Sequence, residues 1–269
     1  VPRHLAFMSS PKLFQLLTQF EKSPHTTTSS TSTDTTTAFD ESIVILSDLW
    51  LDQVETHQRL EKLLRGFRLT GCFPQVFVLL GSFTSKPLGQ NHHDVLSYQK
   101  NMQKLGNLLA RFPKLCALSH IILVPGPLDP NTSSVLPKPP IPNFFVASLA
   151  APLKHFHRAP SPVRIRYCTQ EIVVHRADIV NKMRRYSISK RAISKDALPK
   201  HVVKTLLDQS HLSPLPLTIT PIYWRYDYAL RLNPLPTALI LADKYNQYQV
   251  QYQDTLTFNP GSFSTDFSF

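Results

Sequence analysis

The sequence predicts an α/β sandwich in which two packed mixed sheets are flanked by helices. Three short, continuously apolar runs in the first half are typical of strands buried on both faces. Amphipathic helical patterns separate these runs, and this β-α-β-α-β alternation indicates parallel pairing with right-handed crossovers. The second half contains runs of alternating polarity, which indicate antiparallel strands in a second sheet that packs on the first.

Each element has its own signal. The apolar strands are expected at residues 43–46, 76–80 and 121–124. Apolar residues at helical spacing predict helices over 54–67 and 95–112, with Asp52 and Asp94 as N-caps. The second half is expected to contain strands at 163–167, 172–174, 217–219, 238–241 and 249–258, and helices at 177–185 and 199–207.

Three regions are expected along the 269 residues. Residues 1–25 form a short amphipathic segment, and residues 26–40 form a Ser/Thr-rich linker that lacks apolar surface and should be disordered. Residues 41–269 are expected to form the main domain. No run approaches the roughly 20 apolar residues of a membrane span, so no membrane association is expected. Because Val1 stands where an initiator Met would, we expect a fragment or a processed piece.

The net charge of +11 indicates an acidic partner, either a phosphate backbone or an acidic protein surface. Charge alone predicts only weak, non-specific DNA binding, and a basic protein with no nucleic-acid role is equally compatible with it. The candidate nucleic-acid contacts are Arg184, Arg185, Lys190 and Arg191, and the alternative is a solvated basic surface. The three cysteines are far apart, fit no zinc pattern and are expected to be buried thiols.

Polar turns follow the three apolar strands, at the edge of the sheet where α/β proteins place their sites. A two-metal phosphoesterase would hold Asp-x-His, Gly-Asp and Gly-Asn-His at three such turns. Here the ligand positions of these turns hold Asp48 and Trp50, then Ser82, then Pro127 and Leu128. A dinuclear centre needs about five or six oxygen and nitrogen ligands, so we expect neither metal nor catalysis. Asp48 and Asp129 are then expected to cap helices or to bond loop amides.

Two aromatic segments are candidates for a partner surface. The first is the Pro-rich loop 137–145, with Phe144 and Phe145. The second is 223–228, with Tyr223, Trp224 and Tyr226, for which core packing at the seam between the two sheets is the favoured interpretation. The histidines at 92, 93, 155 and 157 are expected in solvated loops.

Six co-linear motifs in the second half carry a family resemblance. They are Tyr-Cys-Thr-Gln-Glu-Ile-Val at 167–173, Asp-Ile-Val-Asn-Lys-Met at 178–183, His-Leu-Ser-Pro-Leu-Pro-Leu at 211–217, the run 221–230, Ala-Asp-Lys-Tyr at 242–245 and Asn-Pro-Gly-Ser-Phe at 259–263. Together they resemble the B-subunit (second subunit) family of DNA polymerase epsilon, and the similarity extends over about 42–269.

The resemblance implies a calcineurin-like metallophosphoesterase fold without catalytic activity and without a cofactor. Asp243 and Tyr245 would occupy the two histidine positions of the active Gly-His-x-His motif. It also implies a nuclear scaffold that binds the zinc-bearing C-terminal region of the catalytic subunit, and other replisome proteins through domains not in this chain. Two alternatives stay open: a residual metal-dependent phosphodiesterase, and a B-subunit of another replicative polymerase.

Overall fold

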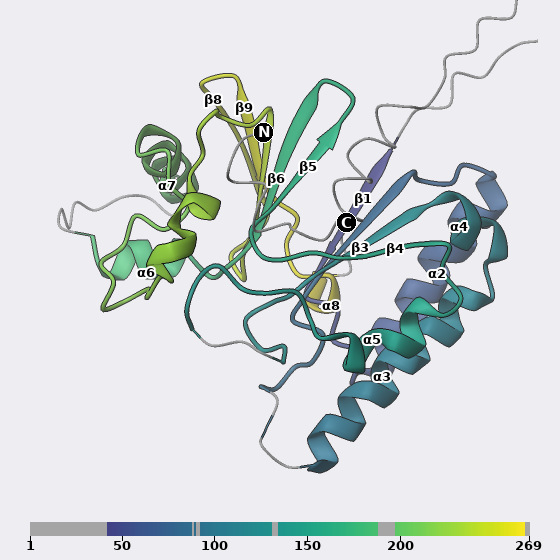
Figure 1. The fold of residues 1–269 in the computed structure, drawn as a ribbon. Helices are drawn as coiled ribbons and strands as arrows, with labels where there is room; N and C mark the ends of the chain where they lie inside the picture. The colour runs from purple at the N-terminus through teal and green to yellow at the C-terminus, as the bar shows by residue number, and fades with distance from the viewer. Residues whose placement is uncertain (1–41, 88, 90–91, 131–133, 188–196, 267–269) are drawn as a thin grey trace, which may run out of the picture.

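The computed structural model describes residues 42–87, 89, 92–130, 134–187 and 197–266 (Figure 1). The amphipathic segment 1–25 and the linker 26–40 lie outside these residues, as do Lys190 and Arg191. All described residues belong to the segment 41–269 that was expected to form one domain.

The first sheet is wholly parallel, with its strands in the order β1-β2-β3-β4. They are β1 (Ile43–Ser47), β2 (Val76–Leu80), β3 (His120–Val124) and β4 (His155–Arg158). Every residue of β2 is buried, because other strands flank it and other layers cover both of its faces. The predicted parallel arrangement is confirmed, and β4 is an edge strand that the sequence pattern did not indicate.

The second sheet is mixed, in the order β5-β6-β7-β9-β8. Its strands are β5 (Val163–Tyr167), β6 (Gln170–Arg176), β7 (Ala238–Ala242), β8 (Tyr248–Tyr252) and β9 (Thr255–Asn259). The strand β6 pairs antiparallel with β5, as predicted, and parallel with β7. The carboxyl ends of β6 and β7 therefore lie at the same edge of the sheet.

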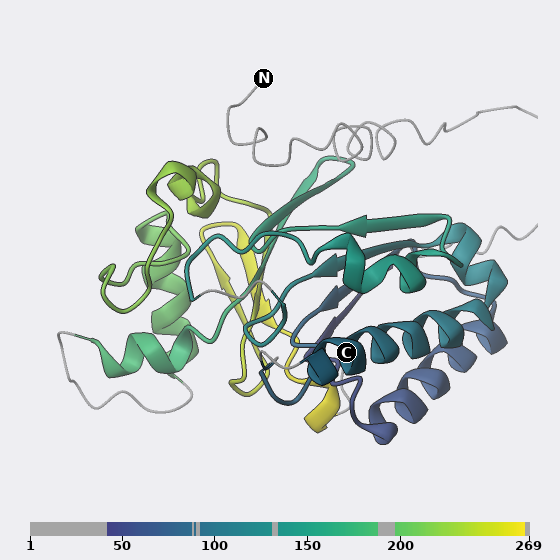
Figure 2. The same ribbon diagram turned by 60° about the horizontal axis from the view of Figure 1, so that its bottom comes forward.

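Helices cover the outer faces of both sheets (Figures 1 and 2). The helices on the side of the first sheet are α2 (Val54–Thr70), α3 (His92–Ala110), α4 (Pro113–Leu118) and α5 (Asn143–Ala150). Those on the side of the second sheet are α6 (Val180–Arg185) and α7 (Ala197–Asp208), with the 3-10 helix η2 (Trp224–Leu230) beside them. The short helix α8 (Phe263–Asp266) closes the described chain next to α2.

Apolar side chains form three buried clusters that join these layers. One lies between the first sheet and its helices and includes Leu60, Phe77 and Met102. A second lies between the two sheets and includes Val78 and Val174. The third joins the second sheet to α6 and α7. The predicted sandwich of two packed sheets flanked by helices is confirmed, with the refinement that only the second sheet is mixed.

Local predictions in the second half were less accurate. Residues 217–219 form a turn, because the backbone amides of Ile219 and Thr220 both donate to the carbonyl of Pro216. The predicted strand 249–258 is a hairpin of β8 and β9, with Gln253 and Asp254 at positive φ in its turn.

The predicted helix caps were wrong. Asp52 precedes the N-cap of α2 and instead accepts hydrogen bonds from the amide and hydroxyl of Ser85. Asp94 lies inside the first turn of α3, since that helix begins at His92. The predicted burial of the cysteines holds for Cys116, whereas the other two cysteines are exposed.

Among the described helices, none is both long and apolar enough to cross a membrane.

Candidate functional site

Three turns meet at the carboxyl ends of β1, β2 and β3, and two buried carboxylates join them. The backbone amide of Ser82 donates to Asp48 Oδ1 at 3.1 Å. Asp129 accepts from the amide of Phe83 at 2.8 Å and from the amide of Gly126 at 2.7 Å. Both carboxylates therefore bond loop amides, as the sequence predicts, and each crosses from one turn to a neighbouring turn.

Glycine is required where two of these turns come closest. A Cβ atom on Gly81 would lie 1.8 Å from Asp129 Oδ2, and a Cβ atom on Gly126 would lie 2.3 Å from the carbonyl carbon of Gly81. Both contacts are far shorter than side-chain carbons tolerate. The two glycines thus allow the backbones after β2 and β3 to approach each other directly.

A guanidinium from the second sheet lies between these turns. Arg176, at the end of β6, is fully buried. Its Nη2 donates to both carboxylate oxygens of Asp48, at 2.8 and 3.1 Å, and its Nε donates to the carbonyl of Gly81 at 3.0 Å. Its Nη1 donates to Asp178 Oδ1 at 2.7 Å and to the carbonyl of Ala242 at 3.2 Å. All three nitrogens of the side chain are therefore bonded.

The charge of Arg176 is fixed by its neighbours. Burial by itself lowers the pKa of the guanidinium, but Asp48 and Asp178 more than offset this effect, and the pKa lies above its usual value. A buried charge is tolerated only when it is paired and hydrogen-bonded, and these two carboxylates meet that condition. The site consequently contains a permanent cation.

The residues of this site do not fit a pair of divalent ions. Both oxygens of Asp48 bind the guanidinium, and Ser82 Oγ accepts from the amide of Leu128 at 3.3 Å. The side chains of Trp50, Pro127 and Leu128 offer no metal-binding atom. Within the described ranges, no three His, Cys, Asp or Glu side chains group as metal ligands. Arg176 thus supplies positive charge where the predicted ligand positions converge.

The other two predicted ligand positions have structural roles. Asp243 follows β7 and is buried, and this burial raises its pKa. Its Oδ2 accepts from the amides of Ile179 and Val180 at 2.6 and 2.9 Å, so it anchors the start of α6. Its Oδ1 accepts from the amide of Tyr245 at 3.0 Å. The half-buried Tyr245 side chain packs against the cluster beneath α6 and α7.

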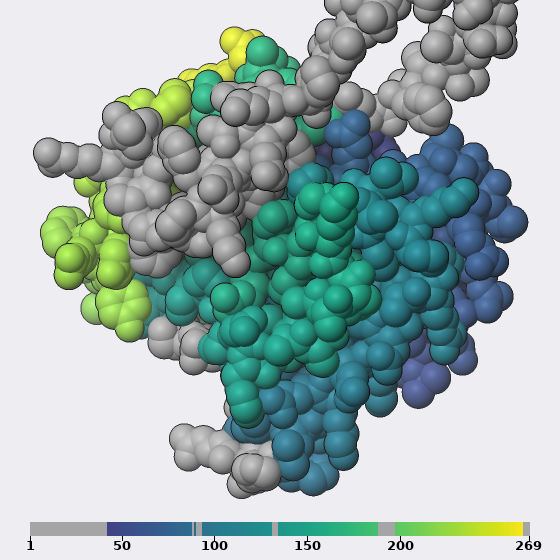
Figure 3. All heavy atoms as spheres, turned by 45° about the vertical axis from the view of Figure 1, so that its right-hand side comes forward, coloured from purple at the N-terminus to yellow at the C-terminus, as the bar shows by residue number. Residues whose placement is uncertain are grey.

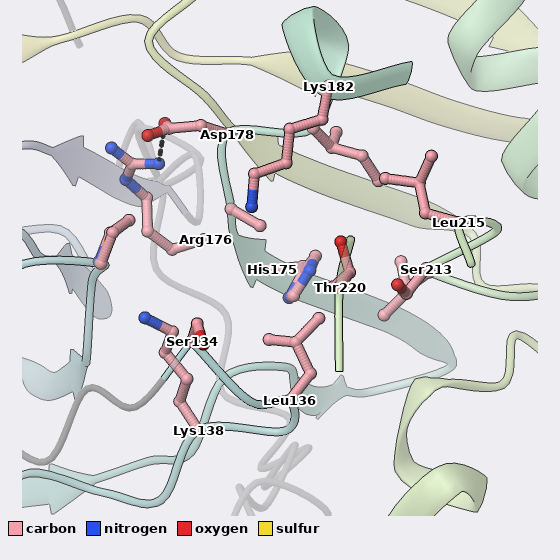
Figure 4. A pocket seen from close by; sticks show the side chains of 14 residues that line it. Ser134, Leu136, Lys138, His175, Arg176, Asp178, Lys182, Ser213, Leu215 and Thr220 are labelled. Carbon is pink, nitrogen blue, oxygen red and sulfur yellow. Dashed lines mark hydrogen bonds and ion pairs between the residues drawn. The ribbon is translucent and has the colours of Figure 1, made fainter. Parts of the chain in front are cut away.

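A cavity of about 230 Å³ opens beside Arg176 (Figure 4). Its polar lining includes Lys138, His175, Lys182, Ser213 and Thr220, and leucines complete the wall. Burial lowers the pKa of Lys138 to about 8, and its Nζ donates to the carbonyl of Gly126 at 3.3 Å. Burial also lowers the pKa of His175 to about 3, so this imidazole is neutral.

The predicted aromatic surface residues lie in two separate places. Phe144 and Phe145 belong to α5 rather than to a loop. Phe144 is 66% exposed, while Phe145 is partly buried and packs edge-on against Tyr98 with ring centroids 5.4 Å apart. The helical pattern was hidden in the sequence by the prolines that precede Asn143.

The second aromatic segment lies on η2 and just before it. Tyr223 is 51% exposed and Trp224 is 75% exposed, whereas Tyr226 is half-buried. The favoured interpretation, core packing between the sheets, is therefore wrong for Tyr223 and Trp224. In the space-filling view, the lime-coloured segment around η2 lies at the outer side of the molecule (Figure 3).

The structure describes half of the predicted nucleic-acid contacts. Arg184 and Arg185 are exposed at the end of α6. Lys190 and Arg191 lie outside the described residues.

The prediction of solvated loop histidines was wrong for His155 and His157. Both lie on β4 and face His120 of β3, because β4 extends the first sheet. The rings of His120 and His155 stack with centroids 4.5 Å apart, and His120 Nδ1 lies 3.3 Å from His157 Nε2. His93 is exposed, and it is helical because α3 begins at His92.

The sequence pattern did not single out Arg176, although it contained a usable signal. One residue, His175, separates Arg176 from the apolar run 172–174, just as Ser47 separates Asp48 from the apolar run 43–46. A charged residue in that position is expected at the edge where sites gather.

The amino-acid sequence of this chain is similar to a known family of proteins. The family model for the B-subunit of DNA polymerases alpha and epsilon matches residues 43–250. DNA polymerase epsilon subunit 2 of Homo sapiens is 41% identical over 231 residues, which cover 86% of this chain and 43% of that protein. The DNA polymerase epsilon B-subunit of Arabidopsis thaliana is 38% identical over 233 residues, covering 86% of this chain and 44% of that protein.

The chain therefore spans less than half the length of these curated relatives. Among solved structures, one titled as a novel archaeal phosphodiesterase aligns with a TM-score of 0.38 and 11% identity. That alignment covers 82% of this chain and 83% of the other.

Proposed function

Since this chain belongs to the B-subunit family of DNA polymerases alpha and epsilon, we propose that it is a non-catalytic part of an accessory subunit of DNA polymerase epsilon. The names of the relatives above support epsilon over another replicative polymerase. The observation that carries the lack of catalysis is the buried ion pair of Arg176 with Asp48. A fixed cation there opposes the binding of divalent metal by electrostatic repulsion. It also engages both oxygens of Asp48, the only carboxylate among the predicted ligand positions of the three turns.

The proposed role is to bind the C-terminal, zinc-bearing region of the catalytic subunit, in the nucleus, during chromosomal replication. Stable partner surfaces are anchored by large apolar and aromatic side chains at their centre. Trp224 and Tyr223 supply such anchors on the side of the second sheet, and Phe144 supplies one on the side of the first. We expect the contact to include one of these two places and to bury more than about 2,000 Å² in total.

The test is a pull-down of the C-terminal fragment of the polymerase epsilon catalytic subunit. Trp224→Ala, Tyr223→Ala and Phe144→Ala are compared with Leu69→Ala, which removes an 83% exposed apolar side chain from α2. At least one aromatic variant should weaken binding about tenfold or more, as expected for an anchor, and Leu69→Ala should not. Arg185→Glu tests the electrostatic alternative. If only this charge reversal abolishes binding while every variant stays folded, the apolar-anchor proposal is wrong.

The phosphodiesterase alternative has its own test. The protein that carries this chain is incubated with Mn²⁺ and an aryl phosphodiester, and turnover is compared with that of Asp48→Asn. We expect no turnover above background in either sample. Turnover that Asp48→Asn abolishes would contradict the non-catalytic role.

A further inference from the structure

Three buried polar groups in the cavity beside Arg176 have no partner in the described part of the chain. They are His175 Nε2, Ser213 Oγ and Thr220 Oγ1. The three side chains are 1%, 5% and 7% exposed. Buried polar groups are costly unless they are hydrogen-bonded, so within the described part of the chain these three groups are left to solvent or a ligand. In the close view, the three side chains lie next to one another in the cavity (Figure 4).

His175 presents a hydrogen-bond donor to the cavity. The amide of Arg176 donates to Ser161 Oγ at 3.1 Å, and the same oxygen lies 3.3 Å from His175 Nδ1. We assign the Ser161 hydroxyl as the donor of this second contact and Nδ1 as its acceptor. A neutral imidazole carries a single N–H, so we assign that proton to Nε2, the atom without a partner.

The charges around the cavity are mostly positive. Lys138, Lys182 and Arg176 line it, and Figure 4 shows the amino group of Lys182 turned toward its interior. Asp178 is the carboxylate of the lining, and it is engaged by Arg176 Nη1 and by the amide of Lys244. Both of these bonds use Asp178 Oδ1. Apart from Asp178 Oδ2, the groups that the lining offers are donors: an imidazole N–H, two hydroxyls, the Lys182 ammonium, and the hydrogens of the Lys138 ammonium that the carbonyl of Gly126 does not use. Such a lining suits an anion with several acceptor oxygens.

We propose that this cavity binds a tetrahedral oxyanion of the phosphate class, either free phosphate or the end of a phosphate monoester. Donors from several sides match four tetrahedral oxygens better than the two oxygens of a planar carboxylate. The volume of about 230 Å³ is below that of most drug-sized ligand sites, so it admits the anion with a small body only. Leu136, Leu212 and Leu215 offer that body an apolar wall.

This inference does not depend on the proposed role in the polymerase, because it rests on the cavity alone. The partner surface discussed above is tested by pull-down, whereas the cavity is tested with small anions. Failure of either experiment therefore leaves the other interpretable.

The experiment is a titration of the protein that carries this chain with inorganic phosphate and with phenyl phosphate, followed by ³¹P NMR at low ionic strength. Saturable binding of at least one of them is expected. Lys182→Met should weaken it about tenfold, since it removes one charge-assisted contact. Lys182 is exposed, so this variant should fold. Ser213→Ala should weaken binding severalfold, and Lys62→Met, an exposed lysine on α2, should leave it unchanged.

The two probes distinguish the sources of the anion. Tighter binding of phenyl phosphate assigns the cavity to a monoester, and equal or weaker binding assigns it to free phosphate. The proposal is overturned if neither probe binds saturably, or if Lys62→Met weakens binding as much as Lys182→Met does. Acetate binding as tightly as phosphate would also overturn it, because it would indicate a carboxylate site.

Discussion

Arg176 Nη2 contacts both carboxylate oxygens of Asp48, although 128 residues separate the two in the chain. The pair joins the end of β1 in the first sheet to the end of β6 in the second. Both side chains are fully buried. This contact therefore fastens the two sheets to each other at the edge where the predicted ligand positions meet.

Replacing Arg176 with Met should destabilise the protein by about 3–5 kcal/mol, because Asp48 would stay buried without its partner. Asp48→Asn keeps an acceptor for the amide of Ser82 and tolerates the positive φ of 54° at this position. The double variant should be less destabilised than the sum of the single variants, by about 0.5–3 kcal/mol. Urea unfolding measures all four states. Strict additivity would show that the ion pair does not couple the two sheets.

Gly126→Ala should destabilise the protein by about 1–3 kcal/mol or more, because its Cβ would meet the backbone of Gly81. Gly66→Ala is the matched control. Gly66 lies inside α2, and no atom lies within 4 Å of the position that an alanine Cβ would occupy. Alanine there should therefore stabilise the protein by about 0.5–1 kcal/mol. Thermal or urea unfolding of both variants measures the contrast. Changes of the same sign in the free energy of unfolding of both variants would disprove the close approach of the turns that contain Gly81 and Gly126.

Stability should fall as the pH drops from about 6.5 to about 4. Burial, followed by neighbouring histidines, lowers the pKa of His120 and His157 to about 4, whereas unfolded histidine titrates near 6.5. Between these values the unfolded chain binds more protons, so the free energy of unfolding decreases as the pH falls. His175 acts in the same direction, and Asp129, whose pKa is raised by burial to about 6, opposes it.

One variant distinguishes the contribution of His120 and His157 to this pH dependence from that of His175 and Asp129. His157→Gln should flatten the pH dependence between pH 6.5 and 4, and His201→Gln, on the exposed face of α7, should not. Urea unfolding at several pH values measures this difference. An unchanged slope in His157→Gln would rule out the contribution of the pair.

DNA binding should be weak, with a Kd of about 10⁻⁴–10⁻⁶ M at physiological salt, because net charge without base readout gives non-specific affinity. Reversing both Arg184 and Arg185 to Glu should reduce the salt dependence, and Lys62→Glu on α2 should reduce it less. Fluorescence anisotropy with a labelled duplex measures both quantities. A nanomolar, salt-tolerant complex would contradict this expectation.

The amino-acid sequence was enough to predict strands β1, β2 and β3 of the 4-stranded first sheet and the composition of the turns that follow them. Continuous apolar runs report burial on both faces, and the crossovers between them report parallel pairing, so β1, β2 and β3 were predictable within one residue. The residues that follow these strands were also readable, since side-chain chemistry is local. Phe144 was predicted in a loop and β4 was missed. The prolines before α5 and the histidines of β4 do not give a helix or strand pattern, because these short elements are stabilised by the layers that they pack against.

The interactions between the strand ends depend on how the two sheets pack. Asp48 and Arg176 are each ordinary strand-end residues in the sequence, and no spacing rule links positions 128 residues apart. Their pairing requires the second sheet to pack on the first, which places β6 opposite β1 and excludes water from both charges. The orphaned donors of His175, Ser213 and Thr220 have the same origin. His175 comes from β6, and Ser213 and Thr220 come from the connection between α7 and η2. Packing alone brings them to one cavity, because burial and hydrogen-bond satisfaction are properties of the folded neighbourhood rather than of a residue.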